Sequence, residues 1–274
     1  MKRYIFNVIS VILVAVLLVV FIVVFSKVKK QRDSQAGLLE GTDSLQAEST
    51  AVPTMPEPTD AVQASPEVSG GAPTEYPQNT FTQAPEGYFG DALFIGDSRT
   101  VGLSEYGNLE GATFFATTGM SVYNITTEKV SVPGMGKVTF DALMSEKKYG
   151  KIYIMLGINE LGYNQTATVK KYGELIEKIK QYQPQAIIFI EANLHVAQSR
   201  SDTDPVFNND NINIFNQEIS KFADQETVFY IDVNPLFDDE NGNLSDKYTA
   251  DNSHILGKYY KNWKEWLFTV AVVK

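Results

Sequence analysis

The sequence predicts a three-layer α/β fold in which helices cover both faces of a parallel β-sheet. Short apolar segments rich in β-branched and aromatic residues recur along the chain, and such segments are typical of buried strands. Helical patterns separate them, and this alternation indicates parallel strands joined by right-handed crossovers. The five expected strands are Ala92 to Ile95, Ala112 to Ala116, Lys151 to Leu156, Ala186 to Glu191 and Val228 to Val233.

Three segments between and after these strands carry apolar residues at helical spacing. In Thr168 to Tyr182 and in Ile212 to Phe222 the apolar residues fall on one face, which predicts amphipathic helices. A last helix is expected over about Leu256 to Val270, where an aromatic stripe packs on the outside of the sheet. These segments and the strands together predict one domain from residue 89 to residue 274.

The first 26 residues have the composition of a membrane anchor. Tyr4 to Phe25 is a stretch of 22 residues without a charge, and a helix of that length spans about 33 Å, enough to cross a bilayer. The stretch continues into Lys27 and further basic residues, whereas a cleavable signal peptide has a shorter apolar region and a small-residue cleavage site. We therefore expect an uncleaved transmembrane helix in residues 1–26.

Residues 27–88 have the composition of a disordered linker. From Asp33 to Tyr88 there is no Lys or Arg, while nine acidic residues and seven of the eleven prolines fall in this stretch. Such a segment cannot bury enough apolar surface to offset the entropy lost on ordering. A passive spacer is the simpler role for it, and a recognition motif is the alternative.

The side of the membrane is a separate question, on which two arguments disagree. Two basic residues precede the apolar stretch and four follow it within seven residues, which by charge alone favours a cytoplasmic domain. Long domains are nevertheless translocated despite this rule, and a stalk-like linker is typical of exposed proteins. We expect the domain outside the cell membrane. The chain has no cysteine, and this absence favours neither side.

The charge and the motif content exclude several classes of function. From Phe89 onward, 17 basic and 24 acidic residues leave a net charge of −7, so nucleic-acid binding is not expected. There is no phosphate-binding loop and no cluster of metal ligands in the sequence. We therefore expect neither a cofactor nor a metal.

Four polar motifs stand directly after expected strands or after the loop beyond the last one. They are Gly96 to Arg99, Thr117 to Gly119, Gly157 to Glu160, and Asp251 to His254. In open parallel sheets ligands bind beyond the carboxyl ends of the strands. All four motifs are therefore expected at one rim of the sheet.

These motifs contain the groups that acyl transfer needs. A serine hydroxyl is a poor nucleophile unless a base takes its proton and a third group orients that base. His254 lies three residues after Asp251, a spacing that a turn can close, so Ser98, His254 and Asp251 form a candidate catalytic triad. The backbone amides of Ser98 and Gly119 and the side-chain amide of Asn159 could stabilise the oxyanion.

From Phe89 to the C-terminus the sequence resembles the SGNH, or GDSL, hydrolases. The resemblance lies in the motifs GDSRT, TTGMS, GINE and DNSH, which occur in the order found in that family. It implies a flavodoxin-like sheet of strand order 2-1-3-4-5. It also implies Ser98 as nucleophile, His254 and Asp251 as its partners, and an oxyanion hole from Ser98, Gly119 and Asn159.

Three further residues are candidates for substrate contact, each with a structural alternative. Glu160 stands where the family more often has aspartate, which puts the geometry of that loop and the choice of substrate in question. Arg99 could orient a polar substrate, or form a salt bridge. His195 follows the fourth strand and could contact substrate, although a packed loop histidine is the more common case.

The predicted function is that of a surface-anchored serine esterase with a Ser-His-Asp triad. Its predicted substrate is an acylated carbohydrate or a lipid ester. An anchored domain suits an immobile substrate, which favours removal of O-acetyl or other short acyl groups from cell-wall or extracellular polysaccharide. Two alternatives stay open, namely an O-acyltransferase that uses the same triad and a non-catalytic module that binds polysaccharide.

Overall fold

The computed structural model of the chain describes residues 81–273. The expected membrane anchor at residues 1–26 and most of the expected linker lie outside the described residues. Within residues 81–273, no helix combines the length and the apolar character that a membrane span requires.

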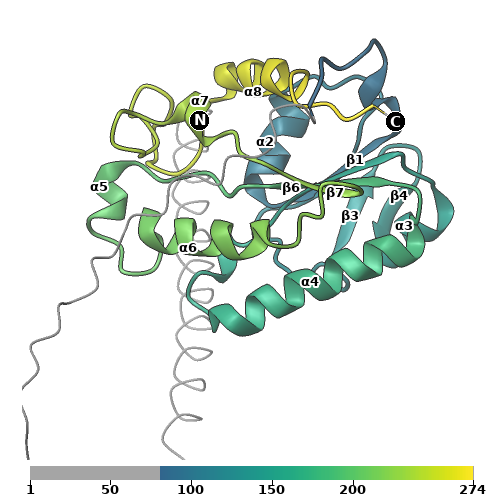
Figure 1. Ribbon diagram of the computed structural model, residues 1–274, viewed down its shortest axis with the longest axis horizontal. Helices are drawn as coiled ribbons and strands as arrows, with labels where there is room; N and C mark the ends of the chain where they lie inside the picture. The colour runs from purple at the N-terminus through teal and green to yellow at the C-terminus, as the bar shows by residue number, and fades with distance from the viewer. Residues whose placement is uncertain (1–80, 274) are drawn as a thin grey trace, which may run out of the picture. The chain divides into compact units, whose positions relative to one another are not determined.

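The domain is built on a five-stranded parallel sheet, as the sequence predicts (Figure 1). Its strands stand in the order β2-β1-β5-β6-β7, and every neighbouring pair is parallel. Counted along the chain this is the order 2-1-3-4-5 that the family resemblance implies. The strands are β1 (Ala92–Gly96), β2 (Thr113–Ala116), β5 (Lys151–Met155), β6 (Ile187–Glu191) and β7 (Val228–Ile231).

Helices cover both faces of this sheet and complete the three layers (Figure 1). One face packs against α3 (Phe140–Glu146), α4 (Gln165–Tyr182) and α6 (Asn209–Ser220). The other packs against α2 (Ser98–Tyr106) and α8 (Tyr260–Leu267). The predicted three-layer α/β fold is therefore confirmed.

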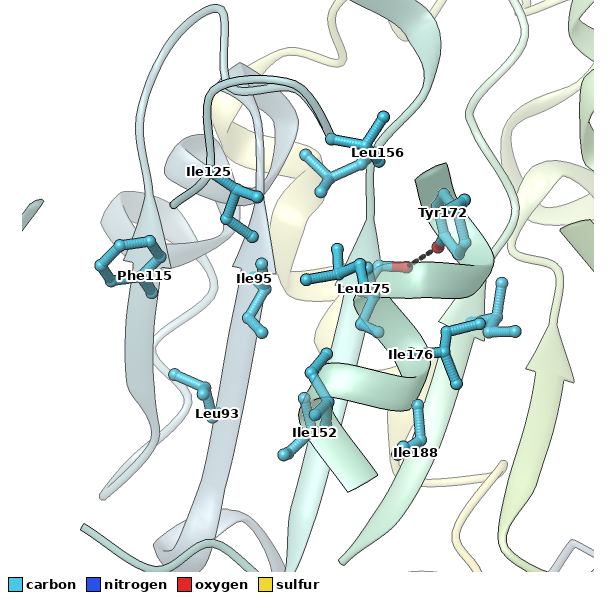
Figure 2. Packing of buried hydrophobic residues seen from close by; sticks show 14 of the residues in the cluster. Leu93, Ile95, Phe115, Ile125, Ile152, Leu156, Tyr172, Leu175, Ile176 and Ile188 are labelled. Carbon is cyan, nitrogen blue, oxygen red and sulfur yellow. Dashed lines mark hydrogen bonds between the residues drawn. The ribbon is translucent and has the colours of Figure 1, made fainter. Parts of the chain in front are cut away.

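The core under α4 shows why the strand segments are apolar throughout. Ile95 of β1 and Ile152 of β5 are fully buried against Leu175 and its neighbours on the helix (Figure 2). The hydroxyl of Tyr172 donates a hydrogen bond to the carbonyl of Ile154 at 3.3 Å, which satisfies a polar atom inside this layer (Figure 2). Burial on both faces fixes the sheet, so the loops at its carboxyl edge project from a rigid base.

Several shorter helices, 3₁₀ turns and strands were not predicted, because they are too short to show a periodic pattern of apolar residues. The expected last helix is also shorter, because Leu256 is extended and a single 3₁₀ turn precedes α8. Besides α2 and α3, the additional elements are η1 (Tyr88–Asp91), the antiparallel hairpin β3 (Lys129–Val132) and β4 (Gly136–Thr139), η2 (Ile158–Glu160), α5 (Gln198–Ser201), α7 (Asn234–Phe237) and η3 (Gly257–Tyr259).

The domain begins earlier than the predicted boundary at residue 89. Thr82 pairs with Ala271 in both directions, and the backbone N–H of Ala84 donates to the carbonyl of Phe268 at 2.7 Å. Ala84 and Tyr88 are buried. The residues from 82 to 88 therefore belong to the domain and not to the linker. Their acidic and proline-rich surroundings hide the boundary, because the contacts that order them come from the far end of the chain.

Candidate active site

Ser98 lies at the first position of α2, directly after β1. Asp97 caps the helix by accepting a first-turn backbone N–H at 2.9 Å. A Cβ atom at residue 96 would collide with the side chain of Thr100 and lie 2.8 Å from the carbonyl oxygen of Met155, so only glycine fits the turn from strand to helix. This tight turn sets the serine at the carboxyl edge of the sheet.

Ser98, His254 and Asp251 form a continuous hydrogen-bonded chain. The distance is 2.8 Å between Ser98 Oγ and His254 Nε2, and 2.7 Å between His254 Nδ1 and Asp251 Oδ2. The other oxygen of Asp251 accepts the backbone N–H groups of Ser253 and His254 at 3.0 and 2.8 Å. With its proton on Nδ1 facing the carboxylate, the imidazole presents Nε2 as the acceptor for the serine hydroxyl.

The carboxyl group of Asp251 is held in its charged form. Burial opposes ionisation, but the backbone N–H of His254, its ring and the backbone N–H of Ser253 outweigh it and lower the pKa of Asp251 to about 2. The group is therefore ionised at neutral pH. An ionised carboxylate at Nδ1 both orients the ring and stabilises the imidazolium that forms when Nε2 takes a proton.

Three N–H donors belong to residues that line the pocket of the serine, namely the backbone N–H groups of Ser98 and Gly119 and the side-chain amide of Asn159. Ser98 begins its helix, and the first backbone N–H groups of a helix have no partner within it. Gly119 has a φ of 79°, a conformation that favours glycine, and Asn124 donates to its carbonyl at 3.2 Å. The side-chain amide of Asn159 donates to the carbonyl of Met120 at 3.0 Å, which leaves its second N–H available. Such donors can stabilise the oxyanion of a tetrahedral intermediate.

Ser98, His254 and the residues that carry the N–H donors line one pocket of about 260 Å³, and Asp251 joins them through its hydrogen bond to His254. The structure thus brings together all five residues predicted for the triad and the oxyanion hole, although they come from four separate loops. The residues that line the pocket are Ser98, Arg99, Thr118, Gly119, Ile158, Asn159, Val196, Arg200, Phe207, Ser253 and His254.

Arg99 lines this pocket, but its charge is compensated inside the protein. Its guanidinium donates to both carboxylate oxygens of Asp97, at 3.1 Å from Nε and 2.8 Å from Nη2. Both side chains are almost fully buried. A bidentate pair of this kind occupies the charged fork of the arginine. The expected salt bridge is therefore present, and Arg99 contributes no unpaired charge to the pocket.

The prediction that Glu160 contacts substrate is wrong, because its side chain points into the domain. Glu160 is 2% exposed, and its Oε1 accepts the backbone N–H of Val122 at 2.7 Å. Burial is the main cause that raises its pKa to about 7, against the opposing effect of the Val122 hydrogen bond. The residue joins the loop that carries Asn159 to the loop that carries Gly119.

His195 is also absent from the pocket, which corrects the prediction of a substrate contact. Both of its ring nitrogens are engaged, Nδ1 with Asp238 and Nε2 with Asn213, each at 2.8 Å. Burial opposes its protonation, but the hydrogen bonds to Asp238 and Asn213 outweigh burial and raise the pKa of His195. It is a packed loop histidine that ties the β6 loop to its neighbours.

The sequence matches a known family over most of the domain. The family described as GDSL-like Lipase/Acylhydrolase matches residues 94–260. The protein belongs to this family. Membership confirms the resemblance and makes the protein a carboxylic ester hydrolase. No curated protein sequence is similar enough to count as a relative.

Solved structures with a similar fold include other proteins of this kind. A GDSL-like lipase from Bacteroides thetaiotaomicron is 17% identical over 67% of this chain and 88% of its own, with a TM-score of 0.50. An acetyl xylan esterase is 14% identical over 65% and 97%, with a TM-score of 0.46. A family two carbohydrate esterase from Clostridium thermocellum is 15% identical over 65% and 61%, with a TM-score of 0.43. The likeness to the first of these structures, at 17% identity, shows the fold.

Two residues of this GDSL-like domain that shape the site were not predicted. Asn193 follows β6; its side chain accepts the backbone N–H of Ile158 at 3.1 Å and donates to the carbonyl of Leu156 at 3.0 Å, so it holds the loop of Asn159. Arg200 lies seven residues further along the same connection and lines the pocket. The one signal for both was their position after the fourth predicted strand, at the rim where the other motifs gather.

Proposed function

We propose that this family member is a serine esterase that removes O-acetyl or other short acyl groups from cell-wall or extracellular polysaccharide. The observation that carries the proposal is the hydrogen-bonded chain from Ser98 through His254 to Asp251, at the edge of a pocket lined with N–H donors.

The first half of the proposed reaction acylates the serine. Ser98 Oγ attacks the carbonyl carbon of the ester while His254 Nε2 takes the hydroxyl proton, and Asp251 stabilises the imidazolium. The carbonyl oxygen becomes an oxyanion that accepts hydrogen bonds from the amides of Ser98, Gly119 and Asn159. The intermediate collapses, the bond from the acyl carbon to the sugar oxygen breaks, and His254 returns the proton to that oxygen.

The second half releases the acyl group to water. His254, neutral again, takes a proton from a water molecule as the water oxygen attacks the acyl carbon of the ester on Ser98. A second tetrahedral intermediate forms at the same N–H donors. It collapses to a free carboxylic acid, and the proton on His254 restores the hydroxyl of Ser98.

Two features support a short acyl group on a carbohydrate. The pocket volume of about 260 Å³ is small for a site that would enclose a long acyl chain. Tyr123 and Tyr163 stack on each other with ring centroids 5.3 Å apart, and both are exposed, at 41% and 62%. They extend from the two loops that carry Gly119 and Asn159, and exposed aromatic rings of this kind mark binding surfaces.

The cell-surface location is part of the proposal and rests on residues 1–80. A membrane anchor followed by a long acidic linker would let the domain reach an immobile polymer outside the membrane. Protease added to intact cells should then cut between residues 33 and 80 and release a fragment that begins near residue 81. Complete protection of the chain in intact cells, with cleavage only after lysis, would place the domain in the cytoplasm.

Turnover of a panel of esters by the full-length protein tests the chemistry. We expect p-nitrophenyl acetate and acetylated glycans to be hydrolysed faster than esters of long fatty acids, and His254→Ala to abolish all of these activities. A sugar acceptor that saturates and accelerates release of p-nitrophenol, with the acetyl group recovered on the sugar, would instead show the acyltransferase. Binding of acetylated glycan without turnover would contradict catalysis at this site.

A further inference from the structure

The candidate active site contains both arginines of residues 81–273, in a domain that is acidic overall. From Phe89 onward the chain has a net charge of −7. Residues 81–273 contain two arginines, Arg99 and Arg200, and both line the pocket that holds Ser98 and His254. The residues that line this pocket include no carboxylate. An arginine that faces such a pocket with free N–H donors can bind and orient an anionic ligand there.

Arg200 is the arginine with hydrogen-bond donors to spare. The guanidinium of Arg99 donates two of its N–H groups to the buried carboxylate of Asp97. Arg200 donates to the hydroxyl of Ser253 through Nη1, and its side chain is 33% exposed. A guanidinium has five N–H donors, and the remaining ones suit a carboxylate or a phosphate.

The neighbours of Arg200 hold its side chain in place without neutralising it fully. Its Cζ lies 5.1 Å from the ring centroid of Phe207, which also lines the pocket, so the planar group rests on an aromatic face. The nearest carboxylate, Asp204, is 3.6 Å from Nη2, beyond direct hydrogen-bond distance. Asp204 already accepts the backbone N–H groups of Val206 and Phe207 at 3.0 and 2.9 Å. A partly exposed pair of this kind is weak.

We propose that Arg200 is a specificity-determining residue that binds an anionic group, a carboxylate or a phosphate, on the carbohydrate that carries the ester. The preferred substrate would then be an acylated acidic polysaccharide. This inference rests on the proposed esterase function, because it assigns the substrate class of the same site. The guanidinium would hold the anion beside the ester, so that the carbonyl carbon lies against Ser98.

A purely positional role for Arg200 is the alternative that the experiment must separate. Through Ser253 the arginine contacts the loop of Asp251 and His254. If that contact only supports the loop, its loss should impair charged and neutral esters alike. If the arginine binds an anion, its loss should impair charged esters more than neutral ones.

The test uses three esters that differ in one substituent, with the full-length protein. They are the methyl glycosides of O-acetyl glucose, O-acetyl glucuronate and O-acetyl glucose 6-phosphate, and kcat/KM is measured for each. We expect the wild type to have a higher kcat/KM for at least one charged ester than for the neutral one. A preference for the glucuronate would indicate a carboxylate as the natural anion, and a preference for the 6-phosphate would indicate a phosphate. Arg200→Gln should lower the ratio of charged to neutral kcat/KM by roughly 10- to 100-fold, the usual effect of a lost hydrogen bond to a charged group.

Three variants control this result. Arg200→Lys should keep part of the preference, since it retains the charge and loses the fork. Ser253→Ala should keep the ratio, because it removes the contact with the loop and leaves the guanidinium. Lys221→Gln removes an exposed charge directly after α6 and should not change the ratio.

Two results would overturn the inference. One is an unchanged ratio of charged to neutral kcat/KM in Arg200→Gln, whether or not Ser253→Ala also loses activity. The other is a wild type that hydrolyses the neutral ester at least as well as both charged esters. If the wild type hydrolyses none of the esters, the proposed function fails, and calorimetry then decides the inference. Binding of methyl glucuronide or glucose 6-phosphate should weaken by the same factor in Arg200→Gln, and absent or unchanged binding would refute the anion site.

Discussion

Glu160 accepts the backbone N–H of Val122 at 2.7 Å from inside the domain. This bond links the loop after β5, which carries Asn159, to the loop after β2, which carries Gly119. Two donors of the proposed oxyanion hole are therefore held in place by a carboxyl group that never meets the pocket. The glutamate in the third motif matters for the geometry of the site and not for direct contact with substrate.

The titration of Glu160 should make the domain less stable at alkaline pH. Burial raises the pKa of this group from 4.5 to about 7, so the folded protein keeps a proton that the unfolded chain loses. The contribution of Glu160 to the free energy of unfolding is fully present below pH 4.5, and it is lost as the pH rises through about 7. Glu160→Gln keeps an oxygen for Val122 and removes the titration.

Unfolding by urea at pH 5 and pH 8 measures this effect. The variant should lose less stability than the wild type between these pH values, by an amount on the order of 2 kcal/mol. Other titrating groups contribute equally to both proteins and cancel in the comparison. A variant whose stability follows the wild-type pH profile would mean that Glu160 is already ionised in the folded state.

Replacement of the nucleophile should remove the activity and leave the fold intact. Ser98→Ala is expected to lower kcat for p-nitrophenyl acetate by at least about 1,000-fold, because the remaining groups act through the serine. Ser104→Ala in the same helix is the matched control, since its exposed hydroxyl bonds only to the carbonyl of Val101. Similar activities of the two variants would refute Ser98 as the nucleophile.

Loss of the Asn159 side chain should lower kcat by a larger factor than it raises KM. Asn159→Ala is expected to lower kcat by about 100-fold or more, since its N–H stabilises charge that develops only in the transition state. Asn241→Ala, at an exposed turn, serves as control. Melting temperatures should confirm that both variants are folded. A rise in KM with kcat unchanged would place Asn159 in substrate binding.

Asp251→Asn should impair the orientation of the imidazole. An amide that donates to Nδ1 would leave the proton on Nε2, where it cannot accept from Ser98, so kcat should fall by about 1,000-fold or more. Asp246→Asn, an exposed position on the same loop, is the control.

The same substitution has a consequence for acid stability. The pKa of Asp251 is lowered from 3.8 to about 2, so its stabilising effect is present above pH 3.8 and is lost as the pH falls through 2. The wild type should therefore lose more stability than Asp251→Asn between pH 4 and pH 2, as followed by circular dichroism. Parallel acid transitions would show that the carboxylate interactions do not survive in solution.

The exposed tyrosine pair should matter for polymers and not for small esters. Tyr163→Ala removes the more exposed ring, and we expect KM for an acetylated polysaccharide to rise by about 3- to 10-fold, in line with a single aromatic contact. KM for p-nitrophenyl acetate should not change. Tyr106→Ala, another exposed tyrosine, is the comparison. An equal rise for both substrates in Tyr163→Ala would point to a distorted loop.

The sheet was predictable because its strands are buried on both faces, and each one therefore appears as a short apolar run such as Ile187–Glu191. The site was predictable to the extent that three of its motifs directly follow a strand and the fourth follows the loop beyond the last strand. The hairpin β3 and β4 was not, because four-residue strands give too little alternation to separate them from a loop. Nor was the start of the domain, since Thr82 is ordered by Ala271 at the opposite end of the chain.

The sequence by itself determined the order of strands and helices, the positions of the four motifs and the acidic charge of the domain, because periodicity and composition are local properties of the chain. Only the tertiary structure decided which polar side chains meet. Ser98 and His254 are 156 residues apart and come within 2.8 Å, whereas Glu160 and His195 turn away from the pocket and Arg200 turns toward it. Side-chain direction depends on which backbone groups and charges lie nearby after folding, and no local pattern carries that information.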